Sequence, residues 1–324
     1  MVRIHAGWRV SRRQLSHRKT NHPGMSYRLK MNETIPAGIR RIARQQLGGA
    51  LGEIGGITSG EEATAVHETR KHIKKIRAVL RLVRNEIGDG IYREEDDRLR
   101  AIARALSAAR DARVQLQVLE KLSVCPGQES TPFPKTATAL HQEIATASET
   151  FGMQRGAAET TLQGIGDRLE GWPLEKLGID DLCAALRRSY RRGRKGFLGV
   201  NSDPIPENFH TWRKRVKDLW YQTLILQDLN PEVMREIAEA ARTLGRQLGD
   251  LHDLALYHSR LEQDEIGGSE EHEVLLGLAC TGERELARTA IDLGARFFAE
   301  KPGTFGRRLL RYARKWPARR DAAP

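Results

Sequence analysis

The sequence predicts an all-α protein built from two related four-helix bundles. Residues that favour helices dominate, and apolar residues recur with a period near 3.6. No segment alternates convincingly between apolar and polar residues, and no Asn-Gly pair marks a hairpin. An internal repeat divides the helices into two sets. The expected helices are 35–54, 61–87, 92–123, 135–169, 179–196, 206–228, 231–264, 269–299 and 304–316.

Glycine and proline mark the ends of these helices in order. The GG of LGEIGGITSG ends the first helix, the GDG of residues 88–90 ends the second, and a CPG sequence follows the third. The loop QESTPFPK precedes the fourth helix, which ends before a GWP sequence. The loop GVNSDPIPEN separates the fifth from the sixth, Pro231 suits the first turn of the seventh, and KPG at 301–303 separates the eighth from the short last helix.

Two blocks of sequence recur at nearly the same offset. The residues His67, Arg70, Lys71 and Lys74 match His210, Arg213, Lys214 and Lys217, 143 positions later. The segment LSAARDARV matches LGDLHDLAL, 142 positions later, so that Asp111 corresponds to Asp253 and Arg110 to His252. Two blocks in the same order indicate a duplication of one four-helix unit.

The repeat and the loops set the expected domain boundaries. We expect one bundle at 25–172, a second at 173–302, and a basic helix and tail at 303–324. Residues 1–24 are basic but contain no apolar stretch of the kind found in secretory signals. We expect them to form a disordered extension, with orderly entry into the first helix from Met25.

The amino-acid composition limits the classes of partner that the chain is expected to bind. The chain has 324 residues with 54 Lys+Arg against 42 Asp+Glu, and its pI is about 9.9. Such a charge favours an anionic partner. The three cysteines lie far apart without a CxxC, which argues against a zinc site or disulfides and favours a reducing cytoplasm. No apolar run approaches the ~18 residues of a membrane helix, so we expect no membrane partner.

The helix at 61–87 carries two stripes. Ile73, Ile76, Leu80, Val83 and Ile87 step by three and four and form its core face. His67, Arg70, Lys74, Arg77, Arg81 and Arg84 form a cationic ridge on roughly the opposite side. Like charges at this spacing repel by a few tenths of a kcal/mol per pair, and only Glu68 offers local relief. The ridge therefore predicts an external anion.

Other helices add cations. The helix at 206–228 repeats the front of the ridge, then continues with Trp220 and Leu224 in place of arginine. The helix at 179–196 contains ALRRSYRRGRKGF, and the first helix contains three arginines. The candidate anion-binding residues are Arg40, Arg44, His67, Arg70, Lys71, Lys74, Arg77, Arg81, Arg187, Arg191, Arg194, Lys195, His210, Arg213, Lys214 and Lys217.

The paired histidines invite a catalytic or metal interpretation. Metal ligands come as clusters of His, Cys and carboxylate, whereas His67 shares its face with cations that would oppose a divalent metal. Those cations would also lower the histidine pKa and leave a neutral ring that can donate to a phosphate oxygen. No phosphate-binding loop, HExxH or GxSxG occurs. We expect no catalytic residue, no metal and no cofactor, and we expect Asp111 and Asp253 each to anchor a cation of its own bundle.

At these residues the chain resembles a known family. The pattern H-x-x-R-K-x-x-K, its copy, and the RD and HD of the second block resemble the CHAD domain, the conserved histidine α-helical domain. The opening SYRLKMNETIPAGIRRIARQQL is also similar, and the resemblance covers about residues 25–316. It implies two bundles related by a pseudo-two-fold, whose histidine-bearing helices line a basic channel that binds inorganic polyphosphate without catalysis. The replacement of Arg110 by His252 in the second copy departs from a strict duplication.

The resemblance implies a cytoplasmic protein that localises to polyphosphate granules, with polyphosphate-linked enzymes as further possible partners. Three alternatives stay open. A nucleic-acid-binding protein would use Trp8, Tyr190 and Trp316 near basic clusters, although aromatic residues make up only 6% of the chain. A metal-dependent phosphate enzyme would need carboxylates around both histidines. A membrane-surface protein would use the tail RRLLRYARKW, whose apolar face is short.

Overall fold

The computed structural model describes residues 27–57, 62–123, 133–263, 266 and 269–316, and these residues confirm the all-α prediction. The predictions for residues 1–24 and for the end of the tail lie outside them. No strand occurs among the described residues. The helices are α1 (Ile35–Gly55), α2 (Glu62–Ala105), α3 (Ala108–Leu122), α4 (Pro134–Leu169), α5 (Ile179–Ser202), α6 (Pro206–Ile225), the 3-10 turn η1 (Gln227–Leu229), α7 (Pro231–Glu262), α8 (Ser269–Phe297) and α9 (Pro302–Ala313).

The region from 61 to 123 agrees with the prediction at Gly88 and differs from it near Ser107. The chain reverses at Gly88, which has φ +78° and ψ 162°, a conformation that only glycine adopts without strain. We call residues 62–87 and 89–105 the two arms of α2. They run antiparallel, as the ion pair between Arg77 and Asp96 across the hairpin shows. The expected single helix at 92–123 is divided near Ser107, where α3 begins. No glycine or proline lies at this second break, so local sequence did not indicate it.

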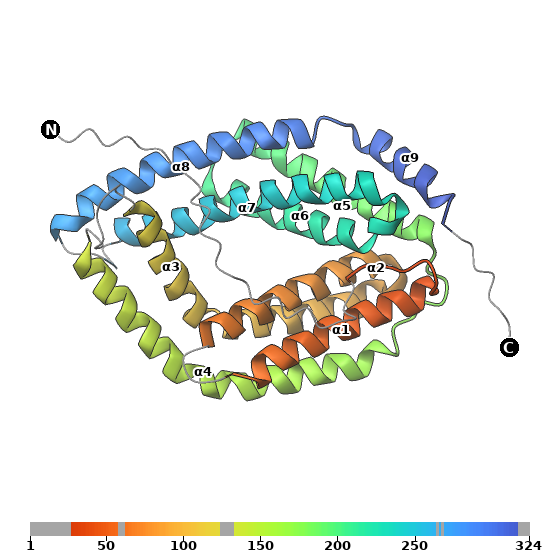
Figure 1. Cartoon of the computed structure of the whole chain (residues 1–324), viewed down its shortest axis with the longest axis horizontal. Coiled ribbons are helices and arrows are strands. Elements are labelled where there is room, and N and C mark those ends of the chain that lie inside the picture. Colours follow the sequence, from red (N-terminus) through yellow and green to blue (C-terminus); the bar gives the residue numbers. More distant parts are fainter. Residues whose placement is uncertain (1–26, 58–61, 124–132, 264–265, 267–268, 317–324) are drawn as a thin grey trace.

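The helices form two groups (Figure 1). One group holds α1, α2 and α4, the other holds α5 to α8, and α3 spans the two at one end. Within the groups, α1 contacts α2 and α4, while α6 contacts α5 and α7. Between them, α2 contacts α5 and α6, and α3 contacts α7 and α8. The fold therefore places α2 and α6, which carry the repeated histidine pattern, against each other.

An aromatic cluster packs the middle of α5 against α9. Tyr190 is 2% exposed, its ring stacks on Phe305 with centroids 4.2 Å apart, and its hydroxyl donates to the Glu300 carbonyl at 2.9 Å. This contact holds α9 on α5. Tyr190 is therefore a core residue, which is unfavourable for the base-stacking role that the nucleic-acid alternative would give it.

Candidate anion-binding site

Cations from three helices gather where α2 meets α6. Burial first, and then the charges of neighbouring arginines, lower the pKa of Lys74 to about 7. Burial and the charge of Arg213 lower the pKa of Lys217 to about 8. Ordinary lysines titrate near 10.4, so these two side chains lie in a partly dry and strongly positive environment. We call the following five residues the central cluster: Arg70, Lys74, Arg110, Arg213 and Lys217.

Several polar atoms of this region lack a hydrogen-bond partner. Within the described part of the chain, Arg70 Nε, Arg213 Nε and His210 Nδ1 are buried and unpartnered. Folded proteins contain few buried polar atoms without a hydrogen-bond partner, because the desolvation cost of each one is then not offset by a hydrogen bond. Two guanidinium donors and an imidazole nitrogen at one place would be satisfied by an oxyanion.

Carboxylates neutralise the central cluster only in part. Asp253 Oδ1 lies 3.7 Å from Arg110 Nη2, an ion pair too long for a hydrogen bond. Arg110 also donates to Asp111 Oδ1 at 3.0 Å. The expectation that each aspartate anchors a cation of its own bundle needs correction: Asp253, on α7, pairs with an arginine of α3, and Asp111 pairs with the residue that precedes it. Burial raises the pKa of Asp253, against the opposing charge of Arg213.

The histidines surround the central cluster in neutral form. The rings of His210 and His252 lie with centroids 4.3 Å apart. Burial, followed by the charges of Arg213 and His210, lowers the pKa of His252 to about 3. The side chain of His67 is 62% exposed and open to a ligand. No group of three or more His, Cys, Asp or Glu among the described residues is placed to hold a metal ion.

Two glycines of α7 shape the α6 face of the site. A Cβ at Gly249 would lie 3.6 Å from Arg213 Nε. A Cβ at Gly245 would lie 3.4 Å from Lys217 Cδ and Cε. Because residues four apart share a helix face, this glycine pair lets both side chains run closely across α7. The sequence LGRQLGD shows this pair of small residues at i and i+4. It does not indicate which side chains of another helix pack against them.

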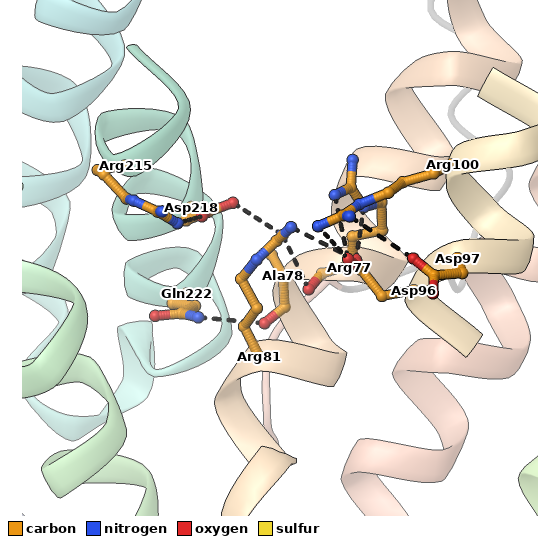
Figure 2. A network of polar contacts seen from close by, with 9 residues as sticks. All are labelled: Arg77, Ala78, Arg81, Asp96, Asp97, Arg100, Arg215, Asp218 and Gln222. Carbon is orange, nitrogen blue, oxygen red and sulfur yellow. Dashed lines mark hydrogen bonds and ion pairs between the residues drawn. The ribbon is translucent and has the colours of Figure 1, made fainter. Parts of the chain in front are cut away.

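The rear of the ridge on α2 is neutralised by the protein itself. Arg77 Nε donates to Asp96 at 2.7 Å, and Arg81 bridges Asp96 and Asp218, with Nη1 at 3.0 Å from Asp218 Oδ1. Figure 2 shows this network between α2 and α6. The expectation that only Glu68 relieves the ridge is wrong, because the second arm of α2 and α6 both bring carboxylates to it. Arg77 and Arg81 therefore lie outside the central cluster and are held by acidic partners.

The other predicted cations are dispersed. Arg40 donates to the Trp172 carbonyl at 2.7 Å and pairs with Glu175 at 2.9 Å. Arg44 pairs with Glu170. These two residues tie α1 to the α4–α5 connection rather than to the central cluster.

On α5, Arg194 donates from Nε to the Phe298 carbonyl at 3.1 Å, Arg187 and Arg191 face α9, and Lys195 is exposed. Lys71 pairs with Glu68 at 2.7 Å. Lys214 is exposed next to the central cluster.

Sequence reasoning left two contributors out of the site. Arg110 and His252 were recognised as corresponding positions of the repeat, but neither was assigned to the ligand surface. Both lie on helices other than the ridge helices, at α3 and α7. Their position in the second repeated block could have indicated this role. A block that recurs together with the histidine pattern predicts that both blocks contribute to one site.

Comparison with known proteins supports this assignment of fold. A family model described as the CHAD domain matches residues 41–262, which is more than half of the chain. The chain belongs to the CHAD domain family. The resemblance inferred from the duplicated histidine pattern is thereby confirmed.

Among solved structures, the fold is similar to the CHAD domain from the plant Ricinus communis. The TM-score is 0.59 with 17% sequence identity, covering 85% of this chain and 95% of that chain. At this identity the likeness concerns the fold alone. No curated protein matches the chain. None of the described helices has the length and apolar character needed to cross a membrane.

Proposed function

We propose that this CHAD domain binds inorganic polyphosphate at the central cluster, without catalysis, and so localises to polyphosphate granules in the cytoplasm. The observation that carries the proposal is the set of buried, unpartnered nitrogens of Arg70, Arg213 and His210 beside Lys74 and Lys217. A protein that keeps such groups together, with Asp253 and Asp111 neutralising them only in part, bears a cost in stability. An anionic ligand offsets that cost.

Polyphosphate matches the chemistry of this surface. It is a flexible linear anion with a negative charge and several acceptor oxygens on each unit. Arginine binds such oxygens in a bidentate manner, and lysine contributes a compact charge. The neutral imidazole of His210 adds a hydrogen-bonding group.

The nucleic-acid alternative has less support from the aromatic residues near the site. The ring of Trp220 stacks on that of Tyr221, with centroids 4.6 Å apart. Lys217 Nζ lies 4.8 Å from the centre of the Trp220 ring. An aromatic platform for single-stranded bases needs a ring face that is free to stack. The ring contacts of Trp220 are internal ones.

The proposal is tested by titrating the protein with long-chain polyphosphate, single-stranded RNA and duplex DNA at near-physiological salt. We expect tight binding of polyphosphate only, and a loss of about 100-fold or more in the variant Lys74→Ala/Arg213→Ala/Lys217→Ala, since each charge-assisted hydrogen bond contributes about 1.5–3 kcal/mol. The matched control Arg235→Ala/Arg284→Ala/Arg288→Ala removes the same charge from exposed positions of α7 and α8. Equal losses in both variants, or equal binding of all three polyanions, would contradict the proposal.

Binding of polyphosphate is expected to depend on pH because Lys74 titrates near 7 and Lys217 near 8. Below these values both lysines are charged before the ligand arrives, and above them they must take up protons. We therefore expect affinity to fall as pH rises from 6 to 9, with proton uptake measurable by calorimetry in two buffers of different ionisation enthalpy. The variant Lys74→Arg stays charged throughout and should show a weaker dependence. An affinity that does not change over this range would contradict the shifted lysines.

A further inference from the structure

A second basic site lies away from the central cluster, where α5 meets α9. A cavity of about 200 Å³ opens there between the two helices. It is lined by Arg187, Arg188, Arg191, Pro302 and Gly303. We call the three arginines the distal arginines. Three of its five lining residues are cations and none is acidic, so the cavity is chemically suited to an anion.

The walls of this cavity are held by contacts with the core. Tyr190 stacks on Phe305 and donates to the Glu300 carbonyl, which fixes α9 on α5. The side chain of Arg187 lies along α9 at Gly306, where a Cβ would come within 2.3 Å of Arg187 Cδ. Because α9 has no side chain at this position, Arg187 runs against its backbone. The basic cavity is therefore part of how α9 attaches.

The distal arginines differ from Arg77 and Arg81 in lacking acidic partners. No hydrogen bond or ion pair joins any of the three to a carboxylate of the described residues, which include the acids Glu86 and Asp181 near Arg188. Burial first, and then the charges of Arg192, Arg187 and Arg191, lower the pKa of Arg188. The positive charge of this cavity is therefore available to a ligand.

A line of cations joins this cavity to the central cluster. Arg192 lies one helical turn after Arg188 on α5, and burial and then the charge of Arg215 on α6 lower its pKa. Arg215, which lies 3.9 Å from Asp218, and Arg213 both add to the effect of burial in lowering the pKa of Lys214. Since α5 contacts both α2 and α6, these residues follow the junction of three helices.

We propose that the distal arginines form a second anion-binding site, which takes the far portion of a long polyphosphate chain whose other portion occupies the central cluster. The inference rests on the proposed function and adds a dependence on chain length. A short polyphosphate reaches one site only. A long chain that is bound at the central cluster meets the second site at a high effective concentration, and gains affinity without any new contact at the first.

The test compares tripolyphosphate with long-chain polyphosphate on the full chain. We expect Arg188→Ala/Arg191→Ala to weaken binding of the long chain by about tenfold or more and to leave the affinity of tripolyphosphate for the central cluster unchanged. The long-chain affinity of this variant should also depend less steeply on salt, because fewer counterions are released. The control Arg284→Ala/Arg288→Ala removes two exposed arginines of α8 and should change neither affinity. Thermal unfolding of both variants checks that α9 stays attached.

The outcomes separate the two proposals. Binding of both ligands by the parent, with the long chain unaffected in the distal variant, would overturn the second site and leave the proposed function standing. An equal loss of both ligands, or the same loss in the α8 control, would also overturn it, because net charge alone would explain the result. A parent that binds neither ligand would overturn both proposals.

Discussion

The variant Asp96→Asn is expected to lose about 3 kcal/mol of stability. Asp96 is 2% exposed and pairs with Arg77, Arg81 and Arg100. Burial opposes its ionisation, but the hydrogen bond from Arg77 and the charges of the three arginines outweigh this effect and lower its pKa. Removing the carboxylate charge leaves Arg77 and Arg81 half-buried and without their shared partner, between the arms of α2 and beside α6.

Chemical denaturation by urea measures this effect. The control is Asp97→Asn on the next residue, whose side chain is 71% exposed and lies 3.5 Å from Arg100. Exposed pairs contribute about 0–1 kcal/mol, so this variant should unfold almost like the parent. Similar midpoints for the two variants would show that the network in Figure 2 does not stabilise the α2 hairpin.

The second large effect concerns Lys74, where stability and binding should change in opposite directions. A lysine whose folded pKa is lowered to about 7 binds its proton more weakly in the folded state than in the unfolded state. The resulting cost is fully present below pH 7, shrinks as the pH rises, and is absent above the unfolded value near 10.4. We therefore expect Lys74→Met to raise the melting temperature at pH 6 by about 2–8 °C, and by much less at pH 10.

The same substitution should weaken polyphosphate binding by about 10- to 100-fold, because one charge-assisted contact is lost. Thermal unfolding at the two pH values and one titration with polyphosphate measure both effects. The control Lys71→Met lies on the same helix, but its lysine is exposed and paired with Glu68, so its melting temperature should hardly change. A less stable Lys74→Met protein at pH 6 would mean that the buried charge is compensated within the fold.

This opposition between stability and binding explains why the central cluster is a better candidate for function than the other basic residues. Arg40, Arg44 and Arg77 all have carboxylate partners, so they contribute to the fold whether or not a ligand is present. The central cluster lacks such balance. Among the described residues, its neighbouring carboxylates Asp253 and Asp111 form their ion pairs with Arg110.

The sequence by itself determined the all-α class, most of the helix ends at glycine and proline, and the family; α5, expected to end at 196, continues to Ser202. These are properties of short segments: the period of apolar residues, the GDG of residues 88–90, and a histidine pattern repeated at one offset. The sequence also placed Arg70 and Lys74 on one face of one helix and their copies Arg213 and Lys217 on one face of another, and the structure brings the two pairs together.

Only the tertiary structure decided which cations are free. Pairing depends on carboxylates that are distant along the chain, as Asp218 is from Arg81, 137 residues apart. Helical periodicity places charges relative to others within about two turns of the same helix. It carries no information on which carboxylates another arm or helix packs against them. For the same reason, helical periodicity did not assign Arg110 and His252, which lie on α3 and α7, to the site. It also did not predict that the arginines of α5 line a separate cavity against α9.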